Sequence, residues 1–162
     1  IVSTLAGSGI GGFADGSGVL AQFNFPTDVA VDSSGNVYVA DKDNHRIRKI
    51  TSSGFVTTLA GSGKAGFNDG EGLSAQFSSP QGISVDSKGN IYVADFNNHR
   101  IRRITPTGVV STFAGIGISG FADADKANVP ALFALPSEVT VDGSGNVYVA
   151  DRDNHRIRKI TQ

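Results

Sequence analysis

The stretch that decides the fold is "NVYVADKDNHRIRKI", which runs from Asn36 to Ile50. It returns as "NIYVADFNNHRIRRI" at residues 90–104 and as "NVYVADRDNHRIRKI" at residues 146–160. Each copy places an Asp, an Asn, a His and an Arg within six residues, a group that could bind a metal, transfer protons or lock a turn. The recurrence helps to choose among these roles.

The repetition extends through the whole chain. Asp41, Asp95 and Asp151 are 54 and 56 residues apart, and about three-fifths of residues 2–54 are identical to residues 56–108. The third copy fits after a two-residue insertion near Asp125–Asn128. A period of this length is typical of the blades of a β-propeller.

Each unit predicts four short strands, separated by turns rich in Gly, Asn and Ser. In the first unit they are residues 28–32, 37–41, 46–50 and 55–61. The first two are apolar runs with little alternation, which indicates a sheet covered on both faces. We therefore expect one all-β domain, residues 1–162, with repeats at about 1–54, 55–108 and 109–162.

The composition excludes several classes of protein. The chain has 162 residues, a net charge of -1 and 18% charged residues, so no overall positive field attracts nucleic acid. The absence of Cys excludes disulfides and thiolate metal sites. No apolar run approaches the length of a membrane span, so we expect no membrane partner. The composition fits any cellular compartment.

The pattern "P-x-x-V-x-V-D-x-x-G-N-x-Y-V-A-D-x-x-N-H-R-I" resembles the NHL-repeat family of β-propellers, over essentially the whole chain and three times. The unit is longer than the shortest repeats of that family, and the extra length lies in segments such as Gly7–Phe25. The resemblance implies a scaffold, because members of the family mostly bind proteins or RNA. It also leaves an enzyme open, because some propellers of the same architecture are metal-dependent lyases or lactonases.

The D-x-x-N-H-R cluster is interpreted as a structural device, since a fold-making group is needed in every blade. We expect Asp41 to pair with Arg46 or to accept hydrogen bonds from the turn, and Asn44 to adopt a left-handed conformation. We expect His45 to pack between blades and donate to a carbonyl. The same structural roles are expected of Asp95, Asn98, His99, Arg100, Asp151, Asn154, His155 and Arg156.

A shared metal site is excluded by geometry. If the inner strands of a six-bladed ring lie about 8 Å from the axis, the third strands lie about 17 Å out, and equivalent atoms of adjacent blades are about 17 Å apart. Histidines that bind one zinc ion need nitrogens about 3–4 Å apart. We therefore expect no catalytic residues, no metal site and no cofactor. An Asp–His pair that does acid–base chemistry within one blade remains the alternative.

Other motifs also have a structural and a functional interpretation. "GSGIGG" does not match a phosphate loop and is taken as a crossing loop. Phe13 and Phe23 are expected to pin the long segment, with Asp15 closing a local turn; a calcium loop is the alternative, although the EF-hand spacing is absent. The basic residues of "RIRKI" (Arg46–Ile50) are taken as solvated and paired with Asp, with RNA binding as the alternative.

Positions that differ among the copies point to function, because the scaffold does not dictate them. They include Lys42, Phe96 and Arg152 in the turns, and Asp28 and Glu138 before the inner strands. We expect all of them on one face, where loops on a rigid scaffold usually recognise partners. The favoured function is a binding scaffold for a protein or peptide, with nucleic acid disfavoured. A small-molecule enzyme at the channel mouth is the alternative.

Three blades cannot close a ring, since propellers have four or more. The chain starts with a fourth strand, residues 2–6, and ends with a third strand. We expect a homodimer with six blades, in which residues 2–6 complete a blade of the partner chain. In that ring Glu138 would face Asp28 of the partner, and the pair would share a proton or hold a cation. The alternative is that the chain is an excised piece of a longer propeller.

Overall fold

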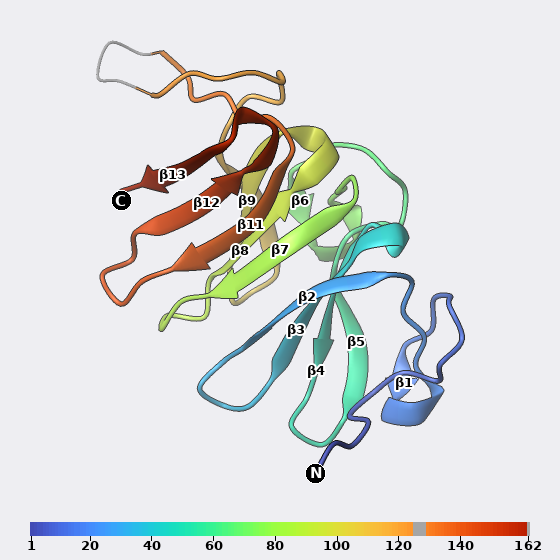
Figure 1. The fold of residues 1–162 in the computed structure, drawn as a ribbon. Helices are drawn as coiled ribbons and strands as arrows, with labels where there is room; N and C mark the ends of the chain where they lie inside the picture. The colour runs from blue at the N-terminus through green and yellow to red at the C-terminus, as the bar shows by residue number, and fades with distance from the viewer. Residues whose placement is uncertain (125–128, 162) are drawn as a thin grey trace.

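A computed structural model describes residues 1–124 and 129–161 of the chain. The insertion expected near residues 125–128 lies outside the described residues. Three antiparallel sheets follow one another along the chain and lie side by side (Figure 1). Their hydrogen-bonded orders are β1-β5-β4-β3-β2, β6-β10-β9-β8-β7 and β11-β12-β13. They are called blades 1, 2 and 3 below.

The predicted strands are confirmed to within two residues at each end, because the turn residues set where each strand stops. Blade 1 contains β2 (Pro26–Val31), β3 (Val37–Asp41), β4 (Arg46–Ile50) and β5 (Phe55–Ala60). Blade 2 contains β7 (Pro80–Val85), β8 (Ile91–Asp95), β9 (Arg100–Ile104) and β10 (Val109–Ala114). Blade 3 contains β11 (Pro136–Val141), β12 (Val147–Asp151) and β13 (Arg156–Ile160).

The long segment before each of the first two blades adds a short strand that the sequence did not predict. β1 (Gly16–Ser17) pairs with the outer edge of β5, and β6 (Gly70–Glu71) pairs with β10 in the same way. Each segment thus wraps around its own blade from the outer edge to the inner strand. The described helices are five single 3-10 turns: η1 (Gly18–Leu20), η2 (Lys42–Asn44), η3 (Gly72–Ser74), η4 (Phe96–Asn98) and η5 (Arg152–Asn154). Among the described residues, no helix is long and apolar enough to cross a membrane.

The apolar core lies between the blades, as the two-sided apolar runs predicted. One buried cluster joins Ile47 and Ala60 of blade 1 to Phe77 and Ile83, which belong to blade 2 and its long segment. A second cluster joins blades 2 and 3. Each blade therefore depends on its neighbour to cover its apolar faces.

The two ends of the three-blade arc lack such neighbours. Among the described residues, the expected strand at residues 2–6 pairs with no other strand, and blade 3 shows three strands, without a fourth. The N-terminus lies near β5 and the C-terminus lies at the opposite end of the molecule, beside β13 (Figure 1). The described structure therefore matches three blades of a propeller, and closure of the ring is not part of it.

The inner strands of blades 2 and 3 approach each other closely at Gly82, on β7. A Cβ atom at this position would lie 2.6 Å from Glu138 Cα and 2.9 Å from the carbonyl oxygen of Ser137, both on blade 3. Only glycine fits there without moving the backbone of the neighbouring blade.

We predict that Gly82→Ala lowers the free energy of unfolding by about 1–3 kcal/mol, because the added methyl group forces blades 2 and 3 apart. Gly143→Ala is the matched control, since a Cβ there would meet nothing within 4 Å. Urea unfolding of both variants measures the difference. Equal stabilities of the two variants would show that the blades have room to separate.

Candidate functional site

The D-x-x-N-H-R turn is a 3-10 turn that ends in a left-handed residue. His45, with φ of 53°, takes this conformation, and His99 and His155 do the same. The prediction for Asn44 was wrong, because Asn44 lies inside η2. From there its side-chain amide donates to Asp41 Oδ2 and to the carbonyl of Gly12, each at 2.8 Å.

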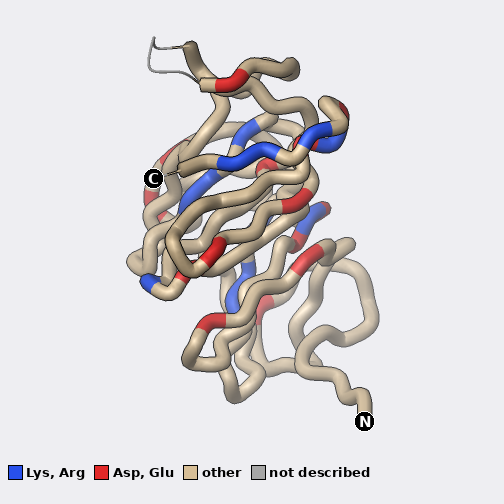
Figure 2. The backbone as a smooth tube through the Cα atoms, turned by 60° about the vertical axis from the view of Figure 1, so that its left-hand side comes forward, with Lys and Arg blue, Asp and Glu red and all other residues tan. Residues whose placement is uncertain are grey.

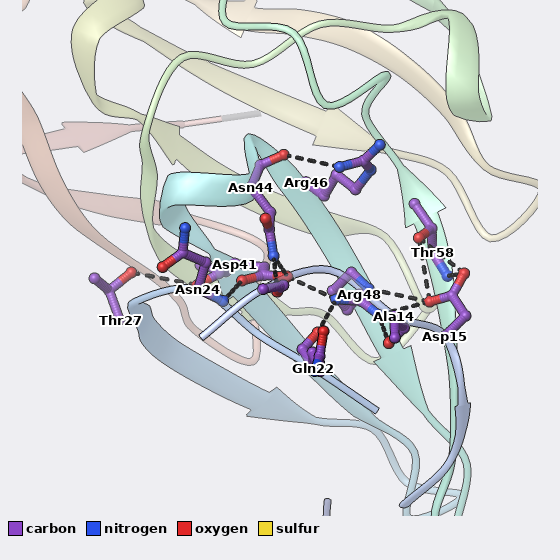
Figure 3. Close-up of polar contacts among 12 residues, drawn as sticks. Ala14, Asp15, Gln22, Asn24, Thr27, Asp41, Asn44, Arg46, Arg48 and Thr58 are labelled. Carbon is purple, nitrogen blue, oxygen red and sulfur yellow. Dashed lines mark hydrogen bonds and ion pairs between the residues drawn. The ribbon is translucent and has the colours of Figure 1, made fainter. Parts of the chain in front are cut away.

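Asp41 is fully buried and accepts three well-formed hydrogen bonds (Figure 3). The donors are the backbone N–H of Asn24 at 2.8 Å, the Asn44 amide at 2.8 Å and Arg48 Nη1 at 2.7 Å. The sequence predicted these turn contacts correctly, but it named the wrong ion-pair partner.

Arg46 lies directly opposite Asp41 in the sheet, yet its side chain leads away from that carboxylate. Its Nη2 donates to the carbonyl of Ser62 at 3.1 Å, and its guanidinium lies 3.8 Å from the centre of the Phe13 ring. Partial burial, and then the neighbouring Arg48 charge, lower the pKa of Arg46. Arg46 therefore connects blade 1 to the long segment of blade 2.

Arg48 is fully buried, so the expectation that the "RIRKI" basic residues are solvated was wrong for this position. Besides Asp41, its guanidinium donates to Asp15 Oδ1 at 2.6 Å, to the carbonyl of Ala14 at 2.7 Å and to the carbonyl of Gln22 at 2.9 Å (Figure 3). It thereby ties the long segment to the middle of the blade.

Asp15 does not close a local turn, contrary to prediction. Its carboxylate pairs with Arg48 and accepts from the backbone N–H and the hydroxyl of Thr58, each at 3.1 Å to Oδ2. The rings of Phe13 and Phe23 lie 4.8 and 5.0 Å from the Arg48 guanidinium. The two phenylalanines therefore do pin the long segment, as expected, and they do so by enclosing an arginine.

Arg48 and its two carboxylate partners, Asp41 and Asp15, are called the arginine node below. The same node recurs in the other blades. In blade 2, Arg102 pairs with Asp95 at 2.6 Å and with Asp69 at 2.7 Å. In blade 3, Arg158 pairs with Asp151 at 2.8 Å and with Asp123 at 2.7 Å. The carboxylates and guanidinium groups of the repeated motif are thus used to hold each blade together.

The histidines connect one blade to the next. His45 Nδ1 accepts a hydrogen bond from the backbone N–H of Ser79 at 3.1 Å, and His99 Nδ1 accepts one from Leu135 at 3.1 Å. The inter-blade position was predicted correctly, but the imidazole accepts where a donor was expected. An Nδ1 that accepts a hydrogen bond already has its lone pair engaged. The Nδ1 atoms of His45 and His99 are therefore not available as metal ligands.

The variable turn residues are not equally exposed. The Arg152 side chain is exposed and that of Lys42 is partly exposed, and each lies near the acid that follows it in the chain. Phe96 is buried, and the Arg152 guanidinium lies 5.5 Å from the centre of its ring. Phe96 therefore supports Arg152 from below and contributes little exposed surface, and its expected role in binding a partner stays a prediction.

Asp28 and Glu138 meet within one chain, which corrects the expectation that they face each other across a dimer. The Asp28 carboxylate lies close enough to influence the Glu138 carboxyl group. The Glu138 carboxylate lies over Gly82, which has no side chain to separate blades 1 and 3. Asp28 Oδ2 also accepts from Ile83 N–H at 2.8 Å. Partial desolvation raises the pKa of Glu138, and the charge and hydrogen bond of Asp28 add to the rise against the opposing bond from Val139 N–H.

A metal centre finds no support in this part of the chain. Within residues 1–124 and 129–161, no group of three or more His, Asp or Glu residues is placed to hold a metal ion. Whether the Asp28–Glu138 pair takes up a cation stays a prediction.

We predict that Asp41→Asn lowers the free energy of unfolding by about 3–5 kcal/mol, because it leaves the Arg48 charge buried with one counter-charge removed. The matched control is Asp43→Asn, two residues away, whose pair with Lys42 at 3.9 Å is partly exposed. The control should change stability by less than about 1 kcal/mol. Urea unfolding of both variants decides the matter; a mild effect at Asp41 would contradict a central role for the node.

Glu138 should make stability depend on pH. Because its folded-state pKa lies above the ordinary value of 4.5, its contribution is fully present below the unfolded pKa and is lost as the pH rises through the folded pKa. We predict that Glu138→Gln melts a few degrees above the wild type at pH 7 and at the same temperature at pH 4. Glu71→Gln, on the exposed β6, is the control. A Glu138→Gln effect independent of pH would argue against a shared proton.

Comparison with known proteins places these features in a family. The NHL-repeat model matches residues 23–50, 77–104 and 133–160, together just over half of the chain. The chain is 43% identical over 99 residues to NHL repeat-containing protein 2 of Gallus gallus, covering 59% of this chain and 13% of that protein. It is 42% identical over 95 residues to the chloroplastic protein SUPPRESSOR OF QUENCHING 1 of Arabidopsis thaliana, covering 57% of this chain and 9% of that protein.

Among solved structures, an auxiliary nutrient binding protein from Bacteroides thetaiotaomicron superposes with a TM-score of 0.73 at 28% identity, covering 82% of this chain and 36% of that one. The chain therefore spans about a tenth of the length of the curated relatives and about a third of the solved one. The repeated motif, the three matched segments and the shared blade structure lead to one conclusion: the chain belongs to the NHL-repeat family, and its three sheets have the fold of β-propeller blades.

Proposed function

We propose that this chain is a non-catalytic scaffold that binds a protein or peptide through one face. This turn face consists of residues 41–45, 95–99 and 151–155 with the adjoining residues 8–12 and 62–66. The observation that carries the proposal is the use of the repeated Asp, Asn, His and Arg groups in structural hydrogen bonds, while two of the residues that vary among the copies, Lys42 and Arg152, are partly or fully exposed. Lys42 and Arg152 are the residues on which we expect a partner to depend.

An enzyme at the channel mouth is supported less well. Asp28 and Glu138 lie on the inner strands β2 and β11, but each accepts a hydrogen bond from a backbone N–H. A family-type metal centre would need further ligands, and none joins them among the described residues.

RNA binding is also disfavoured. In Figure 2 the Lys and Arg segments follow the strands and are interspersed with Asp and Glu segments. Three of the arginines, Arg48, Arg102 and Arg158, are buried and paired with acids, so they offer no charge to phosphates. A binding site for nucleic acid needs a continuous basic surface.

Ligand-induced thermal stabilisation tests the proposed binding face. A glutamate-rich peptide should raise the melting temperature at physiological ionic strength, because Lys42 and Arg152 carry positive charge on the turn face. The double variant Lys42→Ala, Arg152→Ala should lose most of that rise. Lys88→Ala is the control, since Lys88 lies in a turn at the opposite end of the strands. Stabilisation by transfer RNA or by Ca²⁺ and no response to the peptide would favour the alternatives.

We further propose that a second copy of the chain closes the propeller, giving six blades in a homodimer. The support is that blade 3 shows only three strands in the described part of the chain, while residues 2–6 of the same chain have the sequence of a fourth strand and pair with none. A ring buries both unpaired ends, and an open sheet edge otherwise invites aggregation.

Light scattering should give about twice 16.8 kDa, independent of concentration over the range in which the dimer persists. Deletion of residues 1–7 should abolish the dimer, because blade 3 then stays without its fourth strand. A well-behaved monomer or a ring of three chains would contradict closure by two copies.

A further inference from the structure

The edge of blade 3 is an open version of a groove that is filled in blades 1 and 2. Ile157 on β13 is 76% exposed, whereas the equivalent residues Ile47 and Ile101 are 0% exposed. The Asp123 side chain is 76% exposed, against 39% for Asp15 and 42% for Asp69. A cavity of 650 Å³ lies between the β10 end and β13 at this edge. Blades 1 and 2 differ from blade 3 here because β5 and β10 cover this edge, whereas no described residue of this chain pairs with the outer edge of β13.

The N-terminal segment has the sequence of that missing strand. "VSTLAG" (Val2–Gly7) repeats "VTTLAG" (Val56–Gly61) and "VSTFAG" (Val110–Gly115). Val56 and Val110 are 0% and 1% exposed, but Val2 is 100% exposed. The chain therefore contains an exposed segment with the sequence of a fourth strand and an open strand edge on β13. Strands of these two kinds pair with each other in blade 1, as β5 with β4, and in blade 2, as β10 with β9.

We propose that residues 1–6 of a second copy add to β13 in one fixed register. The register is taken from blade 1, where Ile47 pairs with Ala60, Arg48 with Thr58, Lys49 with Thr57 and Ile50 with Val56. It places Val2 opposite Ile160, Ser3 opposite Lys159, Thr4 opposite Arg158 and Ala6 opposite Ile157. This inference rests on the proposed closure by a second copy and names the contacts that make it.

Thr4 is the residue that locks the register. In blades 1 and 2, the backbone N–H and hydroxyl of Thr58 and Thr112 donate to Asp15 and Asp69, at 3.1 Å each to Oδ2. Thr4 is the equivalent residue of the N-terminal segment, and Asp123 is the equivalent carboxylate of blade 3. Asp123 already holds Arg158 at 2.7 Å, so the incoming Thr4 completes the same node.

The residues that follow continue the junction. Phe25 has a φ of 49°, matching 53° at Ser79 and 49° at Leu135, whose N–H groups donate to His45 and His99. His155 of blade 3 is the third histidine of the series, so Phe25 N–H of the second copy is its donor. By the same equivalence, Arg156 donates to the carbonyl of Ser8, as Arg46 donates to Ser62 and Arg100 to Ile116.

The apolar faces at the two ends are complementary as well. Val29 on β2 is 57% exposed, whereas the equivalent Ile83 and Val139 are 3% and 2% exposed. It lies on the free face of blade 1, and Ile157 lies on the free face of blade 3. The contact is head-to-tail, so the rotation between successive copies decides whether they form a closed ring or an open filament. In the proposed arrangement, two copies with three blades each complete a ring of six blades.

Engineered disulfides test the register, and the cysteine-free chain is well suited to them. The variant Ser3→Cys, Lys159→Cys should form a covalent dimer under mild oxidation, visible on a non-reducing gel. Lys49→Cys, Thr57→Cys is the positive control, because the same pair exists within blade 1 and should close without a change in mass. Thr4→Cys, Lys159→Cys is the off-register control and should not cross-link, since adjacent side chains point to opposite faces of a strand.

Substitution of Thr4 tests the lock. Thr4→Val keeps the shape and removes the hydroxyl donor, so the dimer dissociation constant should rise about tenfold. Thr57→Val, on the exposed face of β5, should leave it unchanged.

The outcomes separate the register from closure itself. A dimer by light scattering whose Ser3–Lys159 pair stays reduced, with the Lys49–Thr57 control oxidised, overturns the register and leaves closure intact. A monomer with no intermolecular cross-link overturns closure and the register together. A covalent dimer together with an unchanged dissociation constant for Thr4→Val overturns only the Thr4–Asp123 contact.

Discussion

The structure depends on a guanidinium group that is buried in the middle of each blade. Removing such a charge from water costs several kcal/mol, and only complete pairing offsets this cost. Arg48 achieves it with two carboxylates and two backbone carbonyls, drawn from β3 and from the long segment (Figure 3). Asp15 also accepts a hydrogen bond from the backbone N–H of Thr58 on β5. The Arg48 charge therefore links β3, in the inner half of the blade, to the outer strand β5. The long segment is consequently part of the blade and follows one path around it.

The nodes make each blade a unit, and weaker contacts join the units. Between blades the structure uses apolar packing and a histidine that accepts from the next backbone. Such an arrangement has nearest-neighbour character, so an end blade lacks what the next one would supply. The exposed Val29 and Ile157 are the direct result. The repeated polar motif supplies the contacts inside each blade and at its junction with the next blade.

The three copies differ at positions whose side chains take no part in the arginine nodes or in the histidine junctions. Lys42 and Arg152 sit in turns whose backbone is fixed by η2 and η5, so their side chains vary without harm to the fold. Asp28 and Glu138 vary for another reason: Gly82 leaves space over the inner strand, and the acids from either side fill it. Function in a repeat scaffold is expected at such positions.

The sequence by itself determined the period, the strands and the turns, because these depend on local spacing and on turn chemistry. It could not determine that Arg48, two residues beyond the directly opposite Arg46, takes the buried carboxylate, since that choice depends on the long segment folding back over the blade. Nor could it bring Asp28 and Glu138 together or bury Phe96, because these contacts cross blades. Local sequence determines the strands and turns of each blade. Only the packing of the long segment and of neighbouring blades decides which distant side chains come into contact.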